Sequence, residues 1–335
     1  MREVQSYARD WGLESVPPTL SAEYVVADAS RNALLQPWFV AINSESDAWI
    51  HGVHVTEIPG TAWRDASSPY GYGGPIATST DDEFLRLCWS SYVQFMNEQR
   101  IVAEYVRFHP ALGNERFYGG NIADNREVVT VDLDGVDVAA GYAPRLRTTL
   151  RKADKKAIVY LETDLGASAE RFYEFHWSAL REMGADSFYL FPLEYFRALA
   201  ASGVARLAVC VHDDGAMEQG HWLAAAIFLE ANVASEYHLA ASSREGRALG
   251  ASSFLLDQAA MSAQRRGRKY LYLGGGTDRN PTNPLLFFKA GFSPKRLMYL
   301  TGSTIFNSRG REEVKQAYPD EWRAHSDRPI FHRKV

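Results

Sequence analysis

The sequence contains little cysteine and has no long apolar run. Only Cys88 and Cys210 occur among 335 residues, and they form no C-x-x-C pair. We therefore expect two buried thiols in a reducing compartment and no structural metal. No segment approaches the roughly 20 apolar residues of a membrane helix, and the N-terminus lacks the apolar centre of a signal peptide. These features predict a cytoplasmic protein without a membrane span.

An excess of basic residues is missing as well. The net charge is −5, which argues against a globally basic nucleic-acid-binding protein, with no DNA partner expected, while a local basic patch is left open. The chain has neither a G-x-S-x-G elbow nor a G-x-x-x-x-G-K-S/T phosphate loop, and the glycines of YGYGG lack dinucleotide-binding spacing. His51 and His54 lie three residues apart on a predicted strand, so they should face opposite sides and make poor joint metal ligands.

The chain does contain enough apolar sequence for two domains, because 46% of its residues are hydrophobic. We predict an α/β (α+β) fold with a first domain at residues 1–143, a second at 144–309, and a tail at 310–335 that packs back on the first. The expected strands are 35–42, 49–58, 101–108, 127–133, 158–162, 206–212, 220–230, 269–273 and one or two within 295–306. The expected helices are 81–99, one from 144, 168–183, 192–201, 250–266, a short one ending at Lys289, and one polar helix within 310–335. A turn at Asp213, Asp214 and Gly215 would join the two strands of a hairpin.

Residues 235–292 give the clearest indication of function, because their pattern predicts a strand, a loop, a helix, a second strand and a second helix. Such a crossover makes the two strands parallel, so the loop at 242–252 should lie where ligands bind. Arg247, Gly250 and Ser252 form R-x-x-G-x-S, close to the Q/R-x-x-G-x-G/A loop that holds the coenzyme A pyrophosphate in GNAT acyltransferases. An ordinary helix start with Arg247 in solvent is an equal alternative.

Two further segments suggest binding. The predicted helix from residue 144 carries six cations; a solvated face is the favoured reading and an anion-binding role the other. The glycine- and proline-rich segment 68–75 excludes regular structure, and its Tyr70 and Tyr72 predict either a domain cap or the wall of a substrate cleft. The six cations are Arg145, Arg147, Arg151, Lys152, Lys155 and Lys156.

Six ordered motifs together resemble the Fem family of peptidoglycan-bridge aminoacyltransferases and their acyltransferase relatives. They are SPYGYGG at 68–74, VRFHP at 106–110, LRTTLRKADKKA at 146–157, YHLAAS at 237–242, LYLGGGT at 271–277 and FFKAGFS at 287–293. The resemblance implies two tandem GNAT-like domains, each a mixed sheet flanked by helices, with the acceptor bound between them. The family transfers an aminoacyl group, usually from aminoacyl-tRNA, to an amine such as the lysine side chain of a UDP-linked cell-wall precursor.

The resemblance also implies site residues. Lys289 matches the family lysine and would stabilise an oxyanion or bind the donor's terminal phosphate and ribose; a surface lysine is the alternative. Phe288 would stack on the donor's adenine or lie in the core. One of Tyr237 and His238, neighbours on a strand, would face the cleft and help to remove a proton. Tyr70, Tyr72 and Arg107 are the expected acceptor contacts, with a buried ion pair as the alternative for Arg107.

The predicted function is thus an N-aminoacyl or N-acyltransferase with no tightly bound cofactor. Its acceptor would be an amine on a cell-wall precursor, an amino sugar or a peptide-like metabolite. Its co-substrate would be aminoacyl-tRNA or, alternatively, acyl-CoA bound by the loop that contains Arg247. A non-catalytic ligand-binding module of the same fold is the third hypothesis.

Overall fold

The computed structural model describes residues 16–213 and 220–334. The chain divides into two compact units, one formed by Met1–Asn125 together with Met298–Val335 and the other by Arg126–Leu297. Residues 126–143 therefore group with the second unit and residues 298–309 with the first, whereas the sequence-based division placed each in the other half. The boundaries fall within strand β6 (Asn121–Asp132) and strand β12 (Arg296–Ile305).

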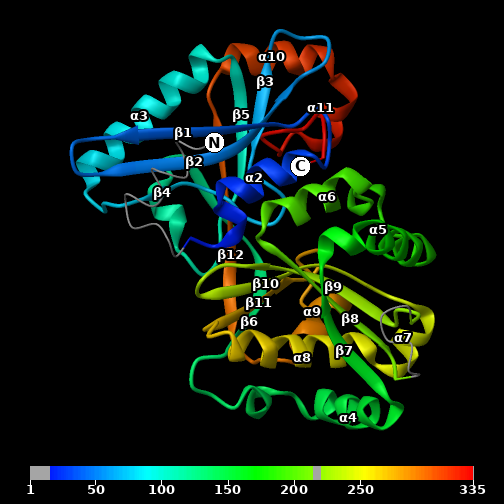
Figure 1. Ribbon diagram of the computed structural model, residues 1–335. Coiled ribbons are helices and arrows are strands. Elements are labelled where there is room, and N and C mark those ends of the chain that lie inside the picture. Colours follow the sequence, from blue (N-terminus) through cyan, green and yellow to red (C-terminus); the bar gives the residue numbers. More distant parts are fainter. Residues whose placement is uncertain (1–15, 214–219, 335) are drawn as a thin grey trace. The chain divides into compact units, whose positions relative to one another are not determined.

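The first unit contains a mixed sheet in the order β1-β2-β3-β5-β12, with β4 on β2 (Figure 1). Its pairs are antiparallel except for β3 and β5, which are parallel. The two predicted strands at 35–42 and 49–58 are confirmed, as is the strand at 101–108. The bounds are β1 Gln36–Asn43, β2 Ala48–Glu57, β3 Arg64–Ser67, β4 Ile76–Ala77 and β5 Ile101–Arg107.

Helix α3 (Asp82–Glu98) packs on this sheet through Cys88, Tyr92 and Met96, which are buried as the amphipathic pattern predicts. Its N-cap Asp81 accepts a hydrogen bond from Phe84 N at 2.8 Å. Three more helices belong to the unit. They are α2 (Ala22–Ala29), which lies in a segment without a clear sequence pattern, and α10 (Ser308–Ala317) and α11 (Pro319–His325), where one polar helix was predicted. Pro319 begins α11, because proline fits the first turn of a helix and not its interior.

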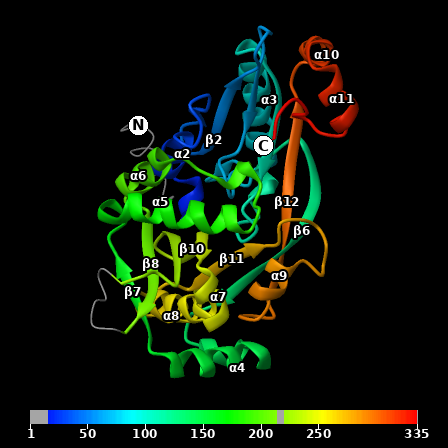
Figure 2. The ribbon, with the colours of Figure 1, turned by 90° about the vertical axis from the view of Figure 1, so that its right-hand side faces the viewer.

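The second unit contains a mixed sheet in the order β6-β11-β10-β9-β8-β7 (Figure 2). Only β10 and β11 are parallel, as predicted from the crossover between them. The turn expected at Asp214 and Gly215 lies outside the described residues. The bounds are β7 Ile158–Thr163, β8 Ala205–His212, β9 Ala224–Glu230, β10 Ala234–Ser242 and β11 Tyr270–Gly275.

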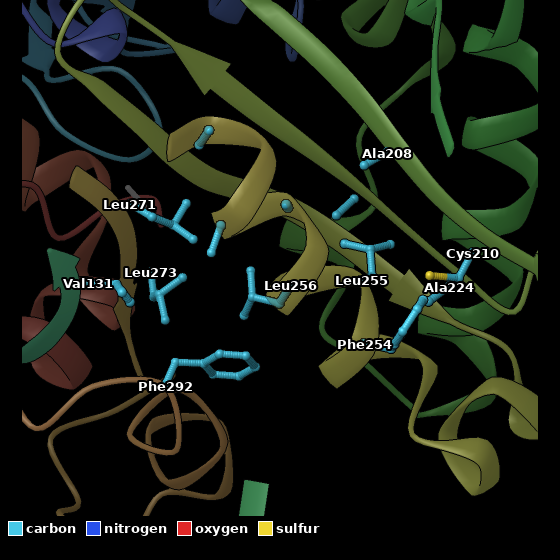
Figure 3. Close-up of a cluster of buried hydrophobic side chains, with 14 of the residues drawn as sticks. Val131, Ala208, Cys210, Ala224, Phe254, Leu255, Leu256, Leu271, Leu273 and Phe292 are labelled. Carbon is cyan, nitrogen blue, oxygen red and sulfur yellow. The ribbon is translucent and has the colours of Figure 1, made fainter. Parts of the chain in front are cut away.

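Helices cover both faces of this sheet. Helix α8 (Ala251–Arg265) packs on β8, β9 and β10, while α5 (Leu165–Glu182) and α6 (Leu193–Ser202) pack on the opposite face. Ala259, Ala260 and Ala263 of α8 are buried, and such small side chains let the helix lie close to the sheet. Figure 3 shows the core that α8 forms with β8, β9 and β11. The remaining helices are α4 (Pro144–Ala153), which packs on α8, α7 (Arg244–Leu249) and α9 (Pro284–Lys289).

The part of the chain that the structure describes holds no helix that is both long and apolar enough to cross a membrane. Within residues 16–213 and 220–334, no three His, Cys, Asp or Glu side chains group in a way that would hold a metal ion. His51 and His54 lie in separate environments, since His51 Nε2 is 3.0 Å from Glu104 Oε1 and His54 Nε2 is 2.8 Å from the Val25 carbonyl.

Candidate active site around Lys289

The site begins where two parallel strands stop pairing. The register of β10 and β11 ends at Glu236 and Tyr272, although β10 continues to Ser242 and β11 to Gly275. Each strand has an irregularity at this level, between Tyr237 and Leu239 in β10 and between Tyr272 and Gly274 in β11. Bulges bend a strand and increase its twist, so they account for the separation of the two strands. Gly274 has a φ of +72°, a conformation that glycine adopts without strain.

Lys289 lies at this separation. It is the last residue of α9, its side chain is buried, and its Nζ donates a hydrogen bond of 2.8 Å to the carbonyl of Gly275. The same Nζ lies 5.9 Å from the centre of the Tyr237 ring. Lys289 thus contacts residues of both diverging strands, and a surface lysine at a helix end is excluded.

Burial lowers the pKa of Lys289 from 10.5 to about 7, with a further lowering from the nearby charge of Arg126. The ammonium and the neutral amine are therefore both accessible near neutral pH. Burial also raises the pKa of the Tyr237 hydroxyl above its ordinary value. Tyr237 consequently stays protonated near neutral pH and is suited to donate a hydrogen bond, not to take up a proton.

A short loop positions α9. Asn283 caps the helix by accepting hydrogen bonds from Leu285 N and Leu286 N, and its Nδ2 donates to Thr277 Oγ1 at 2.8 Å. Gly276 lies against this side chain, because a Cβ at position 276 would be 2.6 Å from Asn283 Cγ. Arg126 donates to the Gly276 carbonyl at 2.9 Å. Asn283 and Arg126 were not identified from the sequence; Asn-Pro at a helix start is a capping signal, whereas nothing in the sequence links Arg126 to a loop 150 residues away.

Tyr237 and His238 point to opposite faces of the second unit's sheet. The Tyr237 ring packs against Phe228 in the core that α8 covers. His238 Nε2 is 2.6 Å from the hydroxyl of Tyr195, a buried residue of α6 on the other face. The structure therefore brings Tyr237 to Lys289 and joins His238 to α6.

The predicted loop at 242–252 is wrong, because residues 244–249 form helix α7. Ser243 caps it by accepting a hydrogen bond from Gly246 N. Arg247 donates to the Ser242 carbonyl at 2.7 Å and pairs with Glu182 at 3.1 Å. Its guanidinium is thus already bound by groups of the protein.

Gly250 and Ser252 lie at the start of α8, beneath helix α4. Gly250 separates α7 from α8 with a φ of +76°, and a Cβ there would lie 2.8 Å from Thr149 Cγ2. Ala251 and Ser253 are buried on either side of the half-buried Ser252. The first turn of α8 is therefore closely covered at the position where the sequence suggested a pyrophosphate.

Two phenylalanines beside Lys289 differ in exposure. Phe288 is half-buried and packs edge-to-face on Phe292, with ring centres 5.6 Å apart, which fits the core alternative. Phe287 is 58% exposed, and the Arg145 guanidinium lies 3.7 Å from its ring centre. Phe287, and not Phe288, is the aromatic side chain of α9 that faces outward.

The expected acceptor residues belong to the first unit, and the structure brings them together. Tyr70 N donates to Asp28 at 2.8 Å, and the Tyr72 ring packs edge-to-face on His109. Gly73 N donates to the Arg107 carbonyl at 2.7 Å, which ties the tyrosine loop to the end of β5. The Arg107 guanidinium lies over the Tyr105 ring at 5.3 Å, and in the described part of the chain no acid pairs with it.

The fold is shared with solved structures of other proteins. FemX superposes with a TM-score of 0.67 at 15% identity over 92% of this chain and 96% of FemX. The C-terminal domain of a proposed lysylphosphatidylglycerol synthetase from Agrobacterium fabrum gives 0.53 at 18% identity, over 87% of this chain and 91% of that domain. L-PGS from Bacillus licheniformis gives 0.53 at 13% identity, over 85% and 92%.

These similarities define the class of fold. The chain has the fold of FemX and of L-PGS, and the resemblance predicted from the sequence motifs is confirmed at the level of the fold. No protein-family model and no curated protein matches the sequence. At identities this low the similarities show the fold and neither the activity nor the substrates.

Proposed function

We propose that the protein is an N-aminoacyltransferase, which forms an amide on an acceptor amine with aminoacyl-tRNA as the donor. The observation that carries the proposal is Lys289, a buried lysine held on the Gly275 carbonyl where β10 and β11 separate. Burying a lysine side chain lowers the stability of the fold, so a buried lysine in such a position is a candidate functional residue. The fold supports the proposal, because FemX shares it.

The reaction needs few groups from the protein. The neutral acceptor amine attacks the ester carbonyl, the C–N bond forms, and the C–O bond to the ribose breaks. The nitrogen loses one proton, and the departing ribose hydroxyl gains one. The ammonium form of Lys289 would stabilise the negative charge that develops on the carbonyl oxygen. Tyr237, whose raised pKa keeps it protonated, would donate a hydrogen bond beside Lys289, whereas His238 is held by Tyr195 on the other face of the sheet.

The surroundings of α7 favour aminoacyl-tRNA over acyl-CoA. A pyrophosphate bound by R-x-x-G-x-S needs a free arginine and open backbone N–H groups at the helix start. Here Arg247 is bound to Ser242 and Glu182, and Thr149 covers Gly250. An acyl-CoA donor would have to displace both contacts.

A donor assay tests the proposal. Purified protein is incubated with a pool of radiolabelled aminoacyl-tRNAs and a panel of amines that includes lysine, amino sugars and a UDP-linked lysine peptide. We expect labelled amide to form, and ribonuclease treatment of the donor beforehand to abolish it. If amide forms from acetyl-CoA or a longer acyl-CoA, and ribonuclease does not affect this reaction, then the donor is acyl-CoA and not aminoacyl-tRNA. Binding of an amine without turnover from any donor would support a non-catalytic module.

A further inference from the structure

Helix α4 and the turn that follows it carry a cluster of positive charges on an exposed surface. Residues 144–156 contain six cations and a single acid, Asp154, which gives +5, while the whole chain carries −5. All six cationic side chains are exposed. We call this surface the α4 basic face; it consists of Arg145, Arg147, Arg151, Lys152, Lys155 and Lys156.

The α4 basic face differs from helices α3, α10 and α11 in how its charges are arranged. On α3, α10 and α11 the exposed cations pair with acids three or four residues away, as Arg86 does with Glu83 and Arg323 with Asp320. On α4, no cation of the face pairs with an acid among the residues that the structure describes. Arg147 and Arg151, and likewise Lys152 and Lys156, even stand four apart, where like charges destabilise a helix. A polyanion bound to the face would remove this repulsion, whereas a merely solvated face would gain from mixed signs.

The α4 basic face begins at the helix that carries Lys289. The Arg145 guanidinium lies over the Phe287 ring and donates a hydrogen bond to the Phe287 carbonyl. Phe287 and Lys289 are two residues apart on α9. The surface thus starts with an exposed aromatic ring beside the proposed reactive lysine and continues along α4 as a row of cations.

We infer that the α4 basic face with Phe287 binds the phosphodiester backbone of the donor RNA near its acylated 3′ end; this inference rests on the proposed function. Nucleic-acid surfaces combine cations that follow the phosphates with an aromatic ring on which an unpaired base stacks. An anionic membrane is the less suitable partner, because membrane docking needs several exposed apolar side chains on the same surface. The exposed positions of α4 itself are charged or threonine, apart from Pro144 at its first position.

A binding assay with uncharged RNA separates this inference from catalysis. The probe is a fluorescent RNA hairpin with a short stem and an unpaired 3′ CCA end, and its affinity is measured by anisotropy across a salt series. The variant R151Q/K152Q/K155Q removes three cations that make no ion pair with any described residue. The matched control R309Q/K315Q/R323Q removes the same charge from α10 and α11.

We expect the α4 variant to lose about tenfold or more in affinity, and the slope of log affinity against log salt to fall by about two to three, one contact for each cation removed. The control should stay within about twofold of the wild type, since it lowers the net charge equally but leaves the α4 basic face intact; an equal loss in both variants would mean that net charge alone governs binding. Phe287→Ala should weaken the hairpin with the CCA end and leave a blunt-ended hairpin unaffected, because only an unpaired base stacks on a ring.

Two results would overturn the inference. One is an α4 variant that binds the hairpin like the wild type or like the control. The other is a wild type that binds vesicles of phosphatidylglycerol and phosphatidylcholine but not the hairpin, which would make the face a membrane surface. Either result leaves the ribonuclease test of the transfer reaction intact, so failure of the RNA surface and failure of the proposed function are distinguishable.

Discussion

The buried amine of Lys289 should make the folded protein less stable near neutral pH than it would be with an apolar side chain at that position. Burial lowers the pKa from 10.5 to about 7, so the folded chain releases a proton that the unfolded chain keeps. At about 1.4 kcal/mol for each tenfold change in proton affinity, the cost is about 5 kcal/mol once the amine is charged. This cost is fully present below about pH 7 and decreases as pH rises towards 10.5.

Lys289→Met removes that cost and one hydrogen bond. Losing the bond to the Gly275 carbonyl should cost about 1–3 kcal/mol, because this part-buried carbonyl loses its hydrogen-bond donor. We therefore expect the variant to be about 2–4 kcal/mol more stable than the wild type near pH 7. The difference should decrease by about 2 kcal/mol between about pH 7 and about pH 9. Above pH 7 the folded protein holds the neutral amine, and removing the proton from the amine costs less free energy as the pH approaches 10.5.

Urea denaturation followed by circular dichroism, at both pH values for both proteins, measures this difference. If the two units unfold separately, the change belongs to the transition of residues 126–297. Lys295→Met is the matched control, since Lys295 is exposed and pairs with Asp132; its effect should be small and independent of pH. A Lys289→Met variant that is several kcal/mol less stable at pH 7, or a difference that does not change with pH, would refute the reasoning.

Three further predictions concern the site and the first unit. The transfer rate kcat/KM should fall as pH rises through about 7, where Lys289 loses its proton. In Lys289→Arg this fall should disappear from the pH profile, because a guanidinium does not lose its proton near pH 7. A fall that is unchanged in the arginine variant would assign the titration to another group. Tyr237→Phe should lower kcat by about tenfold or more, because its hydroxyl is a hydrogen-bond donor beside Lys289, while His238→Ala should lower it less than about threefold, because His238 lies on the other face of the sheet; the reverse order would place the reacting groups beside His238. Asp65→Asn should destabilise the first unit by about 3–5 kcal/mol in urea denaturation, because the buried Asp65 carboxylate binds both His332 and Arg333; a loss below about 1 kcal/mol would contradict a buried ion pair there.

Local patterns were sufficient for most of the secondary structure. The amphipathic spacing of α3 and the strand–helix–strand order around α8 depend on neighbouring residues, and the structure confirms them. Helix α7 was missed, because six residues with Arg, Glu and Gly read equally well as a loop. In the structure Gly246 of α7 lies against the carbonyl of Leu223, the residue before β9, where a Cβ would lie 1.8 Å away. Contacts of that kind are not visible in a local sequence pattern.

The candidate site shows the same limit. The family-like motif pointed to Lys289, but not to its burial, its Gly275 partner or the altered proton affinity that follows. Arg247 was chosen for a spacing that matches a phosphate loop, and its partner Glu182 lies 65 residues earlier in the chain. The sequence also showed the six cations of α4; that none of them has an acidic partner in the described part of the chain, and that they begin at Phe287, became evident only from the structure.

The central claim is that Lys289 serves an aminoacyl transfer reaction, and a single pair of rates tests it most directly. The measurement is kcat/KM for transfer from aminoacyl-tRNA to the accepted amine, with wild type and Lys289→Met at about pH 7. We predict a loss of about 100- to 1,000-fold, as for removal of one oxyanion-stabilising group, in a variant that is folded and at least as stable as the wild type. Equal rates in the two proteins would contradict the assignment.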